Sequence, residues 1–175
     1  MSHYTTTGIN RTSPDYEYIV YLRPKSGGKL ATALQLYSNE SKQIIENEAH
    51  QYLPHCTLTG FFKIPQTMDL KLLTSILHQS LADLENRLGS IISITNIFCN
   101  SGYIGLSFEE ETMNKELRPR IENFATKMKQ YDSNVRVKPE ENSHYHISLA
   151  YGKTFGPTIQ RQLLSLIDAV NIRSA

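Results

Sequence analysis

Two tetrapeptides of one kind are the part of this chain best suited to chemistry, His55-Cys56-Thr57-Leu58 and His146-Ile147-Ser148-Leu149. Each alternates polar and apolar residues, which is typical of a half-buried strand. Because successive side chains on a strand point to opposite faces, each histidine shares a face with the hydroxyl residue two positions later. If the two strands lie side by side, a pair of imidazoles meets across a groove with a hydroxyl beside each.

These side chains suit the cleavage of a phosphodiester. That reaction needs one group to deprotonate the nucleophile, one to protonate the leaving oxygen, and donors for the charge on the phosphoryl oxygens. Histidine titrates near neutral pH, so His55 and His146 can divide the roles of base and acid. The hydroxyls of Thr57 and Ser148 are the predicted phosphate donors. The pattern leaves open which histidine is the base, and it requires neither metal nor cofactor.

Other residues near the motifs are candidates for substrate binding. Phe61 and Tyr151 follow the motifs and can stack on a nucleobase, with core packing as the alternative for Phe61. Strict alternation puts Tyr151 on the face opposite His146 unless a β-bulge intervenes. Lys153 is a candidate for the rim, where its ammonium would meet phosphate. His144 and His146 share a strand face and leave half of a zinc site as an alternative, but no further ligands are evident and no metal is expected.

Strand-like and helix-like segments alternate around the motifs. Strands are predicted over 16–22, 55–64, 91–98, 103–108 and 144–151, and helices over 30–48, 68–88, 109–129 and 158–170. The Asn100-Ser101-Gly102 turn predicts that the third and fourth of these strands form a hairpin. Leucines three and four residues apart make 68–88 the clearest helix. The Ser38–Ser41 stretch suggests either a break of the first helix into two or the start of a second helix. Pro119 argues against an unbroken third predicted helix because proline lacks an amide donor.

Composition is typical of a globular protein. The chain has 175 residues, of which 39% are hydrophobic, enough for a packed interior. We expect residues 1–14 to form a flexible lead-in and residues 15–175 to form one domain. Lys and Arg total 18 and Asp and Glu total 17, a net charge of +1. This balance does not favour long duplex nucleic acid, but it is compatible with a mononucleotide or a short single strand.

The two cysteines, Cys56 and Cys99, have no spacing that suggests a disulfide framework or a Cys-x-x-Cys metal site. Cys56 falls on the core face of the first motif, which favours a small buried group over a nucleophile. The N-terminus lacks the apolar stretch of a signal peptide, and no window is long enough for a membrane span. The sequence therefore predicts a soluble cytosolic or nuclear protein.

The paired motifs resemble the two His-x-Thr/Ser signatures of the two-histidine (2H) phosphoesterase superfamily. Residues 53–62, 103–108 and 146–151 extend this likeness to the phosphoesterase domain of the TULA (suppressor of T-cell receptor signalling) proteins, over residues 16 to 170. The resemblance implies an α+β, bilobal and pseudo-two-fold architecture. Two mainly antiparallel sheets would line a central cleft, with helices outside.

The resemblance also implies metal-independent cleavage of 2′,3′-cyclic nucleotides or of 2′,5′-linked oligoadenylate, so the substrate would be a small nucleotide or a short oligoribonucleotide. His55 and His146 would be the acid–base pair, and Thr57 and Ser148 would bind phosphate. The alternative is a binding module that holds a nucleotide or an RNA end without cleaving it. Ser148 replaces the commoner threonine, which keeps the hydroxyl but loses a methyl group that restrains the rotamer.

Overall fold

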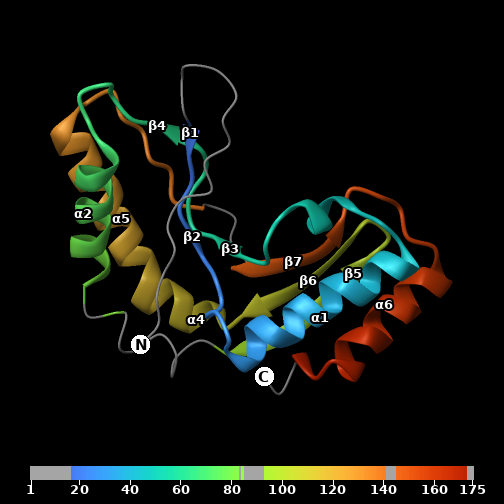
Figure 1. Ribbon diagram of the computed structural model, residues 1–175. Helices are drawn as coiled ribbons and strands as arrows, with labels where there is room; N and C mark the ends of the chain where they lie inside the picture. Colours follow the sequence, from blue (N-terminus) through green and yellow to red (C-terminus); the bar gives the residue numbers. More distant parts are fainter. Residues whose placement is uncertain (1–16, 83, 85–92, 141–144, 173–175) are drawn as a thin grey trace. The chain divides into compact units, whose positions relative to one another are not determined.

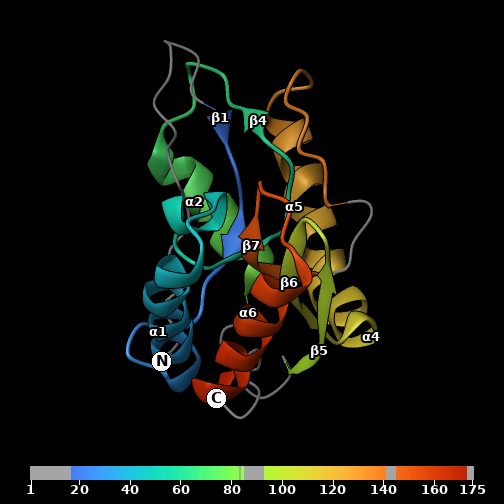
Figure 2. The same cartoon turned by 90° about the vertical axis from the view of Figure 1, so that its right-hand side faces the viewer.

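The computed structural model describes residues 17–82, 84, 93–140 and 145–172, so the predicted lead-in over 1–14 lies outside the described residues. The chain has an α+β fold with antiparallel sheets (Figure 1, Figure 2). Its contacts divide it into two compact units, each assembled from three separate stretches. The first unit is Met1–Leu22, Thr57–Ser93 and Glu109–Tyr145, and the second is Arg23–Cys56, Ile94–Phe108 and His146–Ala175.

A short antiparallel sheet in the first unit pairs β1 (Glu17–Tyr18) with β4 (Phe62–Lys63). The prediction of one strand over 16–22 is wrong in extent, because the strand stops at Tyr18 and resumes only at β2 (Tyr21–Leu22). The amide of Val20, in the gap, donates to the side-chain Oγ1 of Thr59 at 3.0 Å. A buried hydroxyl thus takes the place of a backbone partner and interrupts the ladder.

The predicted strand over 55–64 is also divided in two. It forms β3 (Cys56–Thr57) and β4, and the residues between them pair elsewhere in the first unit. Thr59 makes an isolated antiparallel bridge with Pro139, and the amide of Gly60 donates to the carbonyl of Lys138 at 3.0 Å. The backbone of Thr59 and Gly60 is thus bonded to Lys138 and Pro139 and not to the partners of β3 and β4, which is why the two strands do not join into one.

Helices α2 (Leu70–Leu81) and α5 (Arg118–Tyr131) lie side by side in the first unit (Figure 1). Asp69 caps α2, since its carboxylate accepts the amide proton of Leu72 at 2.8 Å. Fully buried Phe124 of α5 meets the ring of Phe62 edge to face at 6.0 Å.

One member of the predicted leucine stripe on α2 is not in the core. Leu70 is 43% exposed, whereas Leu73 and Leu77 are buried. Leu70 aligns at four-residue spacing with Thr74 and His78, so it lies on the polar face of the helix. Of the predicted helix beyond Leu81, residues 83 and 85–88 lie outside the described part of the chain.

The predicted helix over 109–129 is interrupted near Pro119, as the proline suggested. It consists of α4 (Glu110–Thr112), a π-helical segment η2 (Met113–Leu117) and α5. Pro119 lies in the first turn of α5, where a missing amide donor costs little. The wider π-helical turn precedes it, and Leu117 at that junction is fully buried.

The second unit contains a sheet in the strand order β3, β7, β6, β5. Strands β5 (Ile94–Asn100) and β6 (Tyr103–Phe108) form the predicted antiparallel hairpin, and β7 (His146–Tyr151) pairs with β6. Strand β3 joins the sheet through Cys56, which pairs with Ile147 of β7. The two motif strands are therefore hydrogen-bonded neighbours, which is the condition that the sequence analysis set for the two imidazoles to meet.

Helices α1 (Lys29–Ile44) and α6 (Pro157–Ala169) lie beside each other in the second unit (Figure 1, Figure 2). The predicted break in the first helix at Ser38–Ser41 is wrong. The Ser41 hydroxyl is fully buried and donates to the carbonyl of Ser38 at 3.3 Å, so the polar stretch stays helical. In the described ranges, no helix is long and apolar enough to span a membrane.

Candidate active site

The candidate site is one face of the sheet in the second unit. On β7, His146 and Ser148 are half-buried, whereas Ile147 between them is 1% exposed. Cys56 pairs with Ile147 and is equally buried, so both point into the core. Because side chains alternate along a strand, His55 emerges on the face opposite Cys56. His55, His146 and Ser148 therefore share one face.

The register also sets the spacing of the two histidines. Extending the Cys56–Ile147 pairing by one antiparallel step places His55 opposite Ser148. Cβ atoms directly opposite in such a pair lie about 5 Å apart, and diagonal neighbours lie about 7 Å apart. His146 is the diagonal neighbour of His55. Two imidazoles at this spacing can reach a single phosphate.

The His55 ring is oriented by its own loop. Its Nδ1 lies 2.8 Å from the carbonyl oxygen of Leu53, two residues earlier. A carbonyl can only accept, so Nδ1 carries a proton and donates it. In the neutral ring Nε2 is then the unprotonated atom.

The His146 ring rests against two aromatic rings that the sequence interpretation missed. Phe98 of β5 and Tyr103 of β6 stack with centroids 5.1 Å apart and planes 7° apart. Each meets the His146 ring nearly at right angles, at a centroid distance of 5.8 Å. This pair of rings fixes the plane of the imidazole.

Gly105 makes room for that pair. It lies opposite both Phe98 and Ser148 in the sheet. A Cβ at this position would lie 2.5 Å from Cζ of Phe98 and 2.8 Å from Cε1 of Tyr103. The rings can therefore cover this part of the sheet only because residue 105 has no side chain. A glycine inside a strand pattern is the sequence signal that could have indicated such a close approach.

The phenol of Tyr103 is hydrogen-bonded to the hydroxyl of Ser148, one of the predicted phosphate ligands. Burial raises the pKa of Tyr103, while the bond to Ser148 opposes that shift. The phenol therefore keeps its proton at neutral pH and can act as a donor.

Tyr151 lies on the same face as His146, contrary to strict alternation. The register between β6 and β7 shifts from Ile104–Ala150 to Gly105–Ser148, which leaves Leu149 as an extra residue. This bulge makes two consecutive residues of β7 buried and turns Tyr151 back to the site face. Its ring stacks on Tyr103 at 6.2 Å and 21°. We call Phe98, Tyr103 and Tyr151 the aromatic row.

The remaining predicted residues are half-buried, exposed, or outside the described residues. Thr57 and Phe61 belong to the first unit, where Thr57 is half-buried and Phe61 is 59% exposed, so Phe61 is not a core residue. Lys153 is exposed in the second unit, and its charge acts on the imidazole of His50. His144 lies outside the described residues. Among the residues that are described, no group of three or more His, Cys, Asp or Glu side chains is arranged to hold a metal ion.

A polar network supports the end of β7. The 3-10 helix η1 (Glu48–Gln51) begins after the buried Asn47, whose Oδ1 accepts from the amides of Ala49 at 3.0 Å and Tyr151 at 3.4 Å. The amide of Asn47 donates to Nδ1 of His50 at 3.2 Å, and Nε2 of His50 bonds the Ser41 hydroxyl at 2.9 Å. His50 thus has a structural role, because it joins the end of α1 to the residue that begins η1.

This network makes stability depend on pH. Burial, aided by the charge of Lys42, lowers the pKa of His50 below its usual value of 6.5. The network is intact above pH 6.5 and is lost as pH falls through the lowered pKa of His50, because protonated Nδ1 cannot accept from the backbone amide of Asn47.

We expect the urea midpoint of unfolding to be lower at pH 5.5 than at pH 8, and this drop to be larger in the wild type than in His50→Gln. Expressed as free energy of unfolding, the extra loss in the wild type should be about 1 kcal/mol, the strength of a helix cap. His78→Gln, at an exposed site on α2, should keep the wild-type slope; equal slopes in all three proteins would contradict the role of His50.

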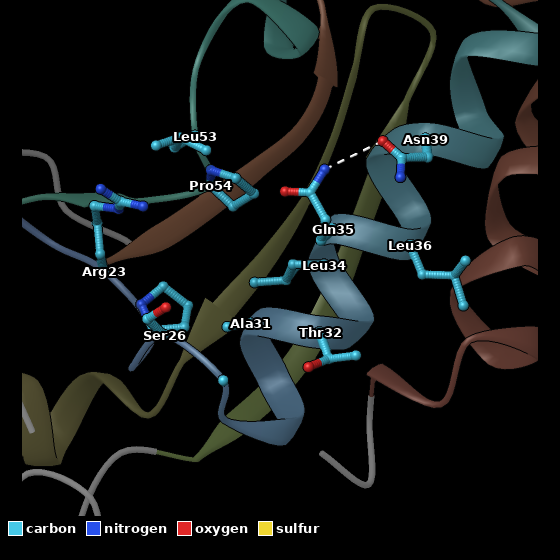
Figure 3. A pocket seen from close by; sticks show the side chains of 12 residues that line it. Arg23, Ser26, Ala31, Thr32, Leu34, Gln35, Leu36, Asn39, Leu53 and Pro54 are labelled. Atoms are coloured by element: carbon cyan, nitrogen blue, oxygen red, sulfur yellow. Dashed lines mark hydrogen bonds between the residues drawn. The ribbon is translucent and has the colours of Figure 1, made fainter.

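An open hollow of about 460 Å³ also lies in the second unit (Figure 3). It is lined by the loop after β2, by α1, and by Leu53 and Pro54, which directly precede His55. Gln35 donates to Asn39 at 3.1 Å on its wall. Among its described lining residues Arg23 is the only charged one, and none is a histidine or a carboxylate. The hollow offers no acid–base pair, so the chemistry is better assigned to the histidine face.

The chain is similar in sequence to larger proteins. It is 30% identical over 136 residues to the ubiquitin-associated and SH3 domain-containing protein B of Mus musculus and of Homo sapiens, a match that covers 77% of this chain and 20% of theirs. A match to the ecdysteroid-phosphate phosphatase of Bombyx mori is 33% identical over 76 residues, 43% of this chain and 11% of that one. The chain thus spans a fifth of the length of the first two relatives.

No family model and no solved structure matches the chain. The mammalian relative is also known as TULA-2, so the resemblance to TULA proteins that the motifs indicated is confirmed at the level of sequence. Membership of the 2H superfamily stays a prediction.

Proposed function

We propose that this chain is a metal-independent phosphodiesterase of the 2H type, acting on 2′,3′-cyclic nucleotides or on 2′,5′-linked oligoadenylate. The observation that carries the proposal is the pairing of Cys56 with Ile147, which makes the two motif strands neighbours. By side-chain alternation, His55, His146 and Ser148 then belong to one face of one sheet. Acid–base cleavage of a phosphodiester requires this set of groups.

With a cyclic phosphate as substrate, one neutral imidazole takes a proton from water as the water oxygen attacks phosphorus. The other imidazole, protonated beforehand, gives its proton to the ribose oxygen as the bond between that oxygen and phosphorus breaks. Ser148 donates to a phosphoryl oxygen, and the first motif assigns the same task to Thr57. The product is a nucleoside monophosphate, and the two histidines have exchanged protonation states.

The aromatic row gives the proposal a place for the base. Nucleobases stack on aromatic faces with little regard to their identity, a contact worth about 1–3 kcal/mol per base. Tyr151, at the end of the row, is half-buried and so retains accessible surface. We assign base stacking to Tyr151 and limit the substrate to a nucleotide or a short oligoribonucleotide.

The name of the Bombyx mori relative describes a phosphatase, which favours phosphoester hydrolysis at the coarser level. Phosphate monoesters are therefore the second candidate class of substrate. A single assay separates the classes: incubation with 2′,3′-cyclic AMP, 2′,5′-linked diadenylate or 4-nitrophenyl phosphate, with and without EDTA, followed by chromatography.

We expect turnover of at least one diester, unchanged by EDTA, and little turnover of the monoester. Binding of the diesters without turnover would favour the non-catalytic module instead. Activity that EDTA abolishes would favour a zinc hydrolase built on His144 and His146. Turnover confined to 4-nitrophenyl phosphate would replace the diesterase with a phosphatase.

A further inference from the structure

We infer that Tyr103 is a positioning residue, whose phenol holds the Ser148 hydroxyl in the one rotamer that binds phosphate. In this chain it does the work that the methyl group of a threonine would do at residue 148. The inference rests on the proposed function for its catalytic consequence, but its structural part can be measured without any substrate.

The strand register brings the two hydroxyls together. Gly105 lies directly opposite Ser148 and has no side chain of its own, so the rings of Phe98 and Tyr103 occupy the space over it. Tyr103 lies two residues before Gly105, on the same face of β6, and its ring reaches across to the Ser148 hydroxyl, to which it is hydrogen-bonded.

The Tyr103 ring is itself held in place. Phe98 stacks on the Tyr103 ring with centroids 5.1 Å apart and planes 7° apart. Tyr151 also stacks on it, with centroids 6.2 Å apart and planes 21° apart. The Tyr103 ring also meets the His146 ring nearly at right angles, with the two centroids 5.8 Å apart. A phenol fixed on these sides presents its hydroxyl at one point, so the bond fixes Ser148 and not the reverse.

A serine at this position needs such help. A serine side chain populates three staggered rotamers, whereas the branched side chain of threonine is restricted at χ1. When Tyr103 donates to Oγ of Ser148, the serine keeps its own proton for a phosphoryl oxygen. One contact thus selects the rotamer and leaves the donor free for the anion.

Tyr103→Phe tests the kinetic consequence, because it removes the hydroxyl and keeps the stacked ring. We expect kcat/KM for 2′,3′-cyclic AMP to fall about tenfold, the effect of one hydrogen bond of about 1.4 kcal/mol. In a Ser148→Thr background the same change should cost about threefold or less, because the threonine restricts its own rotamer. Tyr52→Phe makes the same chemical change at an exposed phenol of the second unit and should leave kcat/KM unchanged.

Three-bond NMR couplings at residue 148, recorded without ligand, test the structural part. We expect one χ1 rotamer in the wild type, averaging in Tyr103→Phe, and a single rotamer again in Tyr103→Phe/Ser148→Thr. Unchanged couplings in Tyr103→Phe would overturn the inference, and so would a kinetic loss that threonine does not rescue. If the wild type cleaves no diester, the phosphodiesterase proposal fails, while the couplings still decide the role of Tyr103.

Discussion

Replacing either histidine of the pair with alanine should lower kcat for 2′,3′-cyclic AMP by about 10²- to 10⁴-fold, the usual range for loss of a general acid or base. The fold should survive both changes. His55 and His146 are half-buried, whereas the core contact between their strands is made by Cys56 and Ile147. The two proton transfers belong to one reaction, so His55→Ala/His146→Ala should be scarcely slower than the worse single variant.

His78→Ala is the matched control, since His78 is exposed on α2 in the first unit. Circular dichroism and the urea midpoint of each variant separate loss of chemistry from loss of fold. Full activity in either His55→Ala or His146→Ala would exclude the acid–base mechanism.

Gly105→Ala should damage the candidate site, because the added methyl group displaces the aromatic rings beside His146. The new Cβ would lie 2.5 Å from Phe98, while apolar atoms normally meet at about 3.5–4.0 Å. The Phe98 ring must therefore move by about 1 Å or more. This movement disturbs its stacking on Tyr103 and its contact with the His146 ring. We expect a stability loss of about 1–3 kcal/mol, as for overpacking of a core.

The catalytic loss in Gly105→Ala should exceed what its stability loss explains. A displacement of about 1 Å at a catalytic group costs on the order of 100-fold in rate. Gly60→Ala is the control, because a Cβ at Gly60 would have no atom within 4 Å. Wild-type kcat/KM in fully folded Gly105→Ala would show that the aromatic pair does not orient His146.

The features that could be predicted are those set by local pattern. The alternation of the two motifs predicted their faces, and the turn at Asn100 to Gly102 predicted the hairpin, in which the Asn100 side chain accepts from the amide of Gly102 at 2.9 Å. Both depend only on residues close together in sequence. The start of α2 is of the same kind, because Asp69 provides its cap three residues before the bonded amide.

The features that were missed depend on partners distant in sequence. The first predicted strand breaks at Val20 because Thr59, 39 residues later, supplies a side-chain acceptor. The bulge that turns Tyr151 towards His146 follows from the pairing of β7 with β6. Phe98 and Tyr103 enter the site only through cross-strand register, which periodicity along one strand cannot reveal.

The assembly of each unit from three separate stretches affects how the protein can form during synthesis. The last stretch of the first unit begins at Glu109 and that of the second at His146. A ribosome must therefore translate beyond Glu109 before the first unit has all its parts, and beyond His146 before the second has. Consecutive domains can instead fold one after another as they are synthesised. Strand β7, which contains half of the proposed catalytic pair, follows all the other described strands in the sequence. Its partners β3 and β6 are therefore synthesised before they can pair with it. Co-translational chaperones should therefore matter more to the yield of this protein than to that of a chain of equal length with two consecutive domains.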